Sequence, residues 1–292
     1  MSKNLTAKAS LVTSMFIFGS IGIFVSFIGL PSGFIAFSRG IIGTACLMVF
    51  ALITKTQISL KSIKKNIILL TLSGAAIGFN WILLFEAYRY TSVSTATLCY
   101  YMAPVFVMLV SPLFLGERLT VLKLLCIVLS IIGMFFVSGV AGGQMPTGRE
   151  FIGIVSGLSA AVLYAMVIIL NKKLKDISSH NKTLVQLGVA GLVVMPYTLL
   201  AEELTPDLFS PLAVGLLICV GVIHTGVAYL LYFGAMKGVS AQTVAIFSYI
   251  DPAVAIVLSD LILGQKMNTL SSIGAVLILS SAIISEMEKK RS

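Results

Sequence analysis

Two titratable side chains, Asp251 and His224, lie deep within long apolar stretches of this sequence. A carboxylate at the middle of a bilayer is costly unless it is paired, hydrated or protonated, so Asp251 is a candidate functional residue. Histidine takes up and releases a proton near neutral pH. Together the two residues are a hypothetical proton site. The alternatives are a structural salt bridge for Asp251 and, for His224, a neutral ring that bonds a neighbouring helix.

Several aromatic side chains lie too far from the predicted helix ends to belong to the aromatic belt at the membrane surface, among them Tyr100 and Tyr164. Their hydroxyls need polar partners at that depth. An apolar wall with a few polar groups suits a small amphipathic solute. We therefore predict a substrate-binding cavity lined by Asn80, Trp81, Tyr100, Tyr101, Tyr164, His224, Tyr229, Ser248, Tyr249 and Asp251.

Two prolines, Pro104 and Pro252, stand near the middle of predicted helices. Each proline removes one helical hydrogen bond and so frees the carbonyl four residues earlier, in Tyr100 and in Ser248. A freed carbonyl at that depth must face protein, water or ligand. We interpret the prolines as paired hinges beside the cavity. The alternative is that they only shape the packing of the helices.

Arg39 and Glu86 are expected close to the same, outer side of the membrane. An ion pair between them is the simplest interpretation, and it would serve either as an outer gate or as a structural lock. Arg89 stands three residues from Glu86 and competes for it, because residues at that spacing meet on one helix face.

The composition is that of an integral membrane protein. The 292 residues are 58% hydrophobic and 11% charged, whereas a soluble domain carries about 25% charged residues. The net charge of +9 does not indicate a nucleic-acid partner, because the basic residues stand at the ends of apolar segments, as topology markers do. The four cysteines lie inside apolar segments without the spacing of a metal site, so we predict neither metal nor cofactor.

The apolar runs predict ten membrane-spanning helices with short connections. Orientation follows from the basic residues: with a cytoplasmic N-terminus, sixteen of the 20 Lys and Arg fall inside, three outside and one, Arg39, within a span. Both termini are then cytoplasmic. The predicted helices lie near 8–29, 33–54, 66–88, 93–114, 120–140, 150–171, 181–201, 211–235, 240–263 and 269–287.

The chain repeats itself after 148 positions. This shift lays Tyr101 on Tyr249, Pro104 on Pro252 and Gly116 on Gly264 without a gap. We predict two five-helix repeats, residues 1–145 and 146–292. Since five is odd, the second repeat is inverted in the membrane, as in many secondary transporters that bind substrate between their halves. Channels and membrane enzymes also duplicate, so those classes stay open.

The repeated stretch resembles the EamA family of the drug/metabolite transporter superfamily. The resemblance rests on the "A-Y-R-Y-T-S" turn that begins at Ala87, on Pro104, and on the "L-G-E-R-L-T" run that ends at Thr120. A weaker copy from Ala235 to Asn268 is similar to the second half of that family, and Arg39 matches an arginine common there. The chain departs from the family pattern where Gln265 replaces the second glutamate.

The resemblance implies ten helices in two inverted repeats, with a central cavity among helices 1, 3, 4, 6, 8 and 9. It also implies export of amino acids or related metabolites, driven by the proton gradient or by the solute's own gradient. Asp251 before Pro252 matches an acidic residue of some members.

We therefore expect a secondary transporter, and not an enzyme, that exports small organic metabolites across the cytoplasmic membrane by alternating access. Its partners would be the metabolite, the lipid bilayer and protons, with the oligomeric state left open. The alternatives are a channel or sensor and a membrane-embedded enzyme, although one deep histidine and one deep aspartate are few residues for catalysis. Phosphate-bearing solutes would need several basic residues within the membrane, and only Arg39 lies there.

Overall fold

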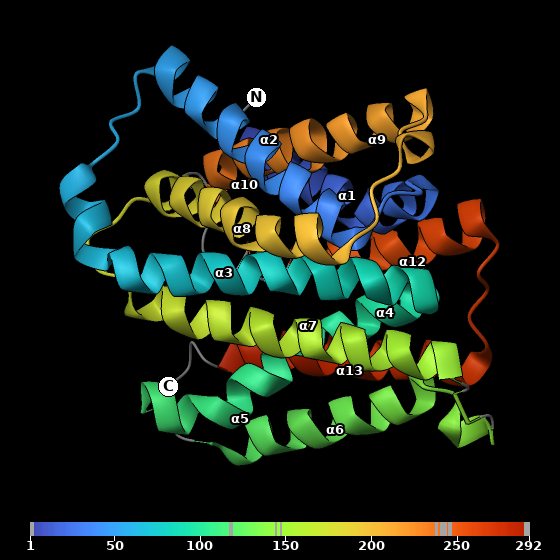
Figure 1. Cartoon of the computed structure of the whole chain (residues 1–292). Helices are drawn as coiled ribbons and strands as arrows, with labels where there is room; N and C mark the ends of the chain where they lie inside the picture. The colour runs from blue at the N-terminus through green and yellow to red at the C-terminus, as the bar shows by residue number, and fades with distance from the viewer. Residues whose placement is uncertain are drawn as a thin grey trace.

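The computed structural model describes residues 3–116, 119–143, 145–146, 148–236, 239, 244 and 247–288, and the regular secondary structure of this part of the chain is helical (Figure 1). A π-helical turn, η3, separates α9 from α10, and two short 3-10 turns, η1 and η2, lie in loops. The bounds are α1 Lys3–Phe27, α2 Ser32–Thr54, α3 Leu60–Tyr90, α4 Val93–Tyr100, α5 Ala103–Leu115, α6 Val121–Val137, η1 Val140–Gly142, α7 Gly148–Lys173, α8 Ser179–Ala201, η2 Pro206–Leu208, α9 Pro211–Gly221, η3 Val222–Val227, α10 Ala228–Met236, α12 Ile250–Leu263 and α13 Thr269–Glu288.

The predicted all-α membrane fold with ten helices in two repeated halves is confirmed. Within the described residues, seven helical runs are long and apolar enough to cross a membrane, counting α4 with α5 and α9 with α10 as single runs. The shorter apolar helices α6 and α13 add two spans, and α12 belongs to the tenth. The predicted start of that tenth span near residue 240 lies outside the described residues, as do Arg118, Lys237 and residues 289–291 of the orientation argument.

The helix α3 begins six residues earlier than predicted. Its first turns carry Lys61, Lys64 and Lys65, which the apolar pattern left outside the span. The hydroxyl of Ser59 accepts the Ser62 N–H at 3.3 Å and so caps the helix before these lysines. A capped polar extension therefore continues the apolar run, as expected where a helix leaves the membrane.

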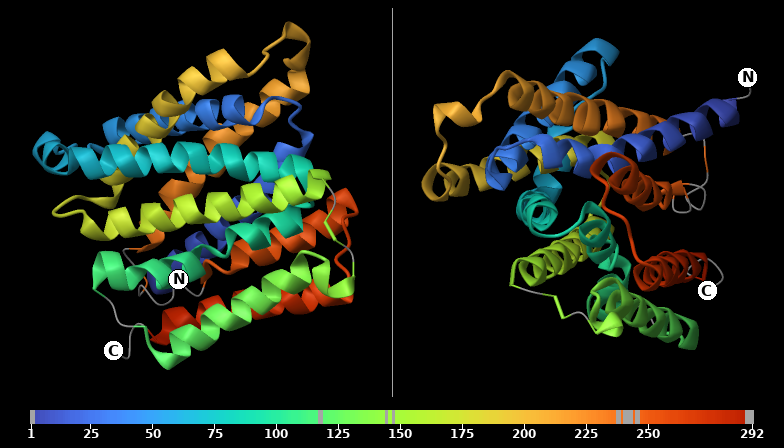
Figure 2. Two further views of the ribbon diagram at one scale, coloured as in Figure 1. Left: turned by 60° about the horizontal axis from the view of Figure 1, so that its bottom comes forward. Right: turned by 90° about the vertical axis from the view of Figure 1, so that its right-hand side faces the viewer.

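The two halves interleave and do not form separate bundles. In the first half, α1 packs on α10 and α12 of the second, and α7 of the second half packs in the corresponding way on α3 and α5. The last helices of the halves, α6 and α13, lie side by side (Figure 2). These contacts between the halves therefore have counterparts in which the two halves exchange roles, as expected for a two-fold repeat.

Each predicted proline hinge is a break in the helix. The helix α4 ends at Tyr100 and α5 begins at Ala103, with Pro104 in its first turn, where a missing N–H costs nothing. In the second half, α12 begins at Ile250, directly after Ser248 and Tyr249. The span predicted over 93–114 is therefore built from two helices, which are separated at Tyr101 and Met102 because Pro104 has no N–H to bond the Tyr100 carbonyl.

One carbonyl predicted to be freed by proline has a partner in the other half. The hydroxyl of Tyr101 donates to the backbone carbonyl of Ser248 at 3.3 Å. This bond joins the break in the first repeat to the break in the second. The two helix breaks therefore meet at the centre of the protein.

Two polar contacts tie the halves together at opposite ends of α8. Beyond its C-terminal end, the Glu202 carboxylate accepts the N–H groups of Gly33 and Phe34 at 2.7 and 2.9 Å, at the start of α2. An anionic group is favourable at that position, since a helix N-terminus carries partial positive charge. Before the N-terminal end of α8, the Asn66 side chain bonds both the carbonyl and the N–H of Lys175, at 2.8 and 3.0 Å.

Glycine is required where α2 and α8 cross. A Cβ added to Gly40 would lie 2.7 Å from the Gly191 nitrogen and 2.8 Å from its Cα, so the two backbones would have to separate. We expect Gly40→Ala to lower the melting temperature of the purified protein, with an overpacking cost of about 1–3 kcal/mol that outweighs the gain of about 1 kcal/mol in helix propensity. Gly215→Ala is the matched control, because a Cβ there meets nothing within 4 Å. Equal melting temperatures for the two variants would contradict the close approach of α2 and α8.

Candidate functional site

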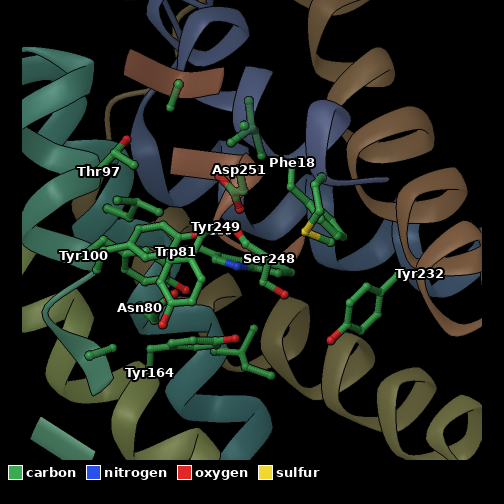
Figure 3. A pocket seen from close by; sticks show the side chains of 18 of the residues that line it. Phe18, Asn80, Trp81, Thr97, Tyr100, Tyr164, Tyr232, Ser248, Tyr249 and Asp251 are labelled. Atoms are coloured by element: carbon green, nitrogen blue, oxygen red, sulfur yellow. Dashed lines mark hydrogen bonds between the residues drawn. The ribbon is translucent and has the colours of Figure 1, made fainter. Parts of the chain in front are cut away.

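A cavity of about 490 Å³ lies among helices of both halves. Its size is in the range typical of sites for small molecules. Figure 3 shows side chains from several helices around this one space. The lining residues are Met15, Phe18, Gly19, Ile21, Arg39, Ile77, Asn80, Trp81, Leu84, Tyr88, Thr97, Tyr100, Tyr101, Ala103, Pro104, Tyr164, Ile168, Tyr229, Tyr232, Ser248, Tyr249, Asp251 and Ala255.

The structure brings together most of the residues that the sequence analysis placed in a cavity. Nine of the ten predicted substrate-binding residues line it, all except His224. Of the four predicted gate or hinge residues, Arg39 and Pro104 line it, whereas Glu86 and Pro252 do not. The roles of these residues in binding stay predictions.

His224 lies on η3 with its ring turned toward α1. Its Nε2 atom is 3.0 Å from the hydroxyl of Ser20, and the ring packs edge-on against Phe24 with centroids 4.6 Å apart. The side chain is buried, with 2% of its surface exposed, and is not among the cavity-lining residues. The structure therefore favours the alternative of a ring that bonds a neighbouring helix. The expected grouping of His224 with Asp251 in one cavity is wrong.

The predicted ion pair between Arg39 and Glu86 is also wrong. Glu86 pairs with Arg89, at 3.1 Å between Oε1 and Nη1, because three-residue spacing places both on one face of α3. Arg39 is buried, and its Nε donates to the hydroxyl of Thr225 at 2.8 Å. Its guanidinium carbon lies 4.2 Å from the centroid of the Trp81 ring. The aromatic face and the hydroxyl hold the cation at the cavity and away from Glu86.

Asp251 stands in the first turn of α12, where partial positive charge favours a carboxylate. Its side chain faces the cavity (Figure 3), which Tyr101 and Arg39 also line. The described ion pairs are Lys65–Asp176 and Glu86–Arg89, so Asp251 and Arg39 are not within 4 Å of each other. The cavity therefore presents one acidic and one basic group that are apart.

A wall of tyrosines covers one side of the cavity. The Tyr100 ring lies 5.2 Å from that of Tyr164 and 6.0 Å from that of Tyr101, measured between centroids. Tyr101 in turn faces Tyr249, its counterpart in the other repeat, at 6.2 Å. Two residues related by the repeat are in contact only near the axis that relates the halves. Corresponding residues of the two halves therefore line one cavity.

Some lining residues were not among the predicted site residues, notably Phe18, Tyr88, Thr97 and Tyr232. Tyr88 and Tyr232 stand near the ends of predicted helices, where aromatic residues of the membrane-surface belt are expected, and so they were not assigned to the cavity. Helical spacing gave a signal for both: Tyr232 follows Tyr229 by three residues, and Tyr88 follows Trp81 by seven. Residues at such spacing share one helix face. Phe18 joins Tyr229 and Tyr232 through ring contacts at 5.3 and 6.3 Å, and nothing in its own segment marked it.

A transporter family and several uncharacterized transporters are similar to this chain. The EamA-like transporter family matches residues 6–139 and again 151–287. An uncharacterized transporter of Bacillus subtilis, YxxF, is 31% identical over 98% of this chain and 91% of its own length. Protein RarD of Escherichia coli is 24% identical over 69% of this chain and 66% of its own length. A solved crystal structure shares the fold, with a TM-score of 0.66 at 16% identity over 98% of both chains.

Proposed function

This chain belongs to the EamA-like transporter family, and we propose that it is a secondary transporter that exports small organic metabolites from the cytoplasm by alternating access. It is a multi-pass membrane protein, and a transporter family moves solutes and does not convert them. The observation that carries the proposal is the cavity of about 490 Å³ built from both repeats, with polar and charged groups set in an aromatic wall.

The proposed solutes are amino acids or related amphipathic molecules. Support comes from the lining, in which the aromatic rings offer contact area while Asn80, Arg39 and Asp251 offer an amide, a cation and a carboxylate. The residues proposed to contact the solute are the predicted ones that line the cavity, namely Asn80, Trp81, Tyr100, Tyr101, Tyr164, Tyr229, Ser248, Tyr249 and Asp251. His224 is left out because its ring bonds Ser20.

Movement between outward-facing and inward-facing states would occur at the two helix breaks, with Pro104 and Pro252 as hinges. The proposed repeats are residues 1–145 and 146–292, with both termini in the cytoplasm. Asp251 is the proposed proton carrier, because it is the acidic residue among the described lining residues. Uptake of a proton from outside would then drive export of the solute.

Untargeted metabolite profiling tests the export proposal. Cells that overproduce the wild-type protein are compared with cells that carry Asp251→Asn at equal membrane levels and with cells without the protein. We expect one class of small amphipathic solute to accumulate in the medium with the wild type alone. If the medium of wild-type cells stays identical to that of cells without the protein, export is refuted under those conditions.

A further inference from the structure

The terminal nitrogens of Arg39 have no hydrogen-bonding partner among the residues that the structure describes. The side chain is 6% exposed, lines the cavity and donates one hydrogen bond, from Nε to Thr225. Trp81 covers one face of the guanidinium at 4.2 Å, and Phe85 lies at 5.9 Å. Within the described part of the chain, no hydrogen bond or ion pair uses its two Nη atoms. A guanidinium has five N–H donors, so four of them are available to a ligand.

The Thr225 hydroxyl accepts a hydrogen bond from Arg39 because its own proton is donated elsewhere. Its single hydroxyl proton is donated to the carbonyl of Val220, five residues earlier, at 3.2 Å. The lone pairs of the oxygen then face Arg39, whose Nε lies 2.8 Å away. Thr225 is fully buried, so water does not compete for either bond.

The π-helical turn that carries Thr225 is fixed against α2. A Cβ added to Gly221 would lie 2.7 Å from Cβ of Ile42, and one added to Gly226 would lie 2.7 Å from Cβ of Cys46. These close approaches hold the backbone on both sides of Thr225 against the helix that bears Arg39. The stretch 148 residues earlier, 74–79, lies in the regular helix α3, so the turn belongs to one half only. Such turns are rare and often occur at functional sites.

We propose that Arg39 is a binding site for a single carboxylate group in the cavity and that Thr225 is the residue that positions its guanidinium; this inference rests on the proposed transport function. A planar cation with free terminal nitrogens binds carboxylate in a bidentate manner. Among the described lining residues Arg39 is the cation, and Asp251 repels additional negative charge, so a phosphate or dicarboxylate fits poorly. The ligand therefore carries one carboxylate on a neutral or cationic body.

Tryptophan fluorescence tests the carboxylate site directly, because Trp81 is the single tryptophan of the chain and stacks on Arg39. The full-length protein in lipid nanodiscs is titrated with four probes of nearly equal size: L-leucine, 4-methylpentanoate, L-leucinamide and 3-methylbutylamine. We expect the two carboxylates to change the emission of Trp81 at concentrations roughly tenfold or more below those needed for leucinamide and the amine, since a hydrogen bond between charged groups has that weight. Equal responses to all four probes, or none to any, would overturn the proposal.

Substitution of Thr225 tests the positioning role. We expect Thr225→Val to weaken carboxylate binding roughly tenfold to a hundredfold and to remove the preference for leucine over leucinamide, whereas Thr225→Ser restores both. Thr198→Val is the matched control, because Thr198 is equally buried and its hydroxyl bonds only the Val194 carbonyl in α8. An unchanged carboxylate preference in Thr225→Val would rule out positioning by Thr225. If Thr198→Val also lost the preference, the loss in Thr225→Val would be a general effect of altered packing and would not support a positioning role.

The outcomes separate this inference from the export proposal, because the fluorescence experiment measures binding without transport. A protein that binds carboxylates through Arg39 and Thr225 but releases no solute to the medium would contradict export and leave the site intact. Export that continues in Thr225→Val with an unchanged concentration dependence would contradict the site and leave export intact.

Discussion

Asp251→Asn is expected to lower the export rate roughly tenfold or more and to abolish the dependence of export on a pH gradient. Asparagine keeps the size of the side chain but can neither carry a proton nor present a negative charge to the cavity. Loss of a hydrogen bond between the Asp251 carboxylate and the solute would cost about 1.5–3 kcal/mol, which corresponds to roughly tenfold to a hundredfold. The measurement is solute efflux from membrane vesicles with and without an imposed pH gradient.

The matched control for this prediction is Asp260→Asn. Asp260 lies on the same helix, α12, but is exposed and outside the cavity. We expect it to export at the wild-type rate with the wild-type response to the pH gradient. If Asp251→Asn responds to the gradient as the wild type does, Asp251 is not the proton carrier and the coupling must use another group.

The double variant Pro104→Ala with Pro252→Ala is expected to slow export roughly tenfold to thirtyfold without weakening ligand binding. Alanine supplies the two missing N–H groups, which can then bond the carbonyls of Tyr100 and Ser248 and straighten both helices. Two restored hydrogen bonds of about 1 kcal/mol each favour the straight state roughly thirtyfold. The Tyr101 hydroxyl would lose its acceptor on Ser248. Efflux rates and Trp81 fluorescence titrations measure the two effects separately.

A proline elsewhere in the membrane provides the control for the hinge prediction. Pro196 lies inside α8, with an exposed side chain and outside the cavity. Pro196→Ala is expected to leave the export rate unchanged or to raise stability, because it removes a helix-breaking residue without altering the breaks at the centre. A double hinge variant that exports as fast as Pro196→Ala would show that Pro104 and Pro252 only shape packing.

The sequence predicted which residues lie near the cavity better than it predicted which way each side chain points from its helix. A constant rise per residue led us to expect Tyr100, Tyr164 and Asp251 at similar depth, and all three line one cavity. The face of a helix depends on its rotation, and η3 changes that rotation within one span. His224, inside the turn, faces Ser20, whereas Tyr229, just after it, lines the cavity. A π-helical turn has no reliable signature in sequence, so this difference was not predictable.

Pairing of charges was hard to predict for a similar reason. Arg39 and Glu86 were both expected near the outer side, but Glu86 pairs instead with Arg89, which lies three residues away on the same helix, α3. The partner that Arg39 takes, Thr225, is an ordinary residue type in an apolar segment and lies 186 positions away in the chain. The interleaving of the halves, with α1 against α12 and α7 against α5, was likewise visible only in three dimensions.

The most direct test of alternating access is whether one cavity position is reached from both sides of the membrane. Ser248 lines the cavity beside the second helix break, and Ser248→Cys is nearly isosteric. The variant is made in a chain whose four cysteines are replaced, and it is treated with a membrane-impermeant thiol reagent in right-side-out and inside-out vesicles. We predict labelling from each side, reduced from one side when Pro104→Ala and Pro252→Ala are added. Labelling from one side only in the protein with both prolines would contradict alternating access at this cavity.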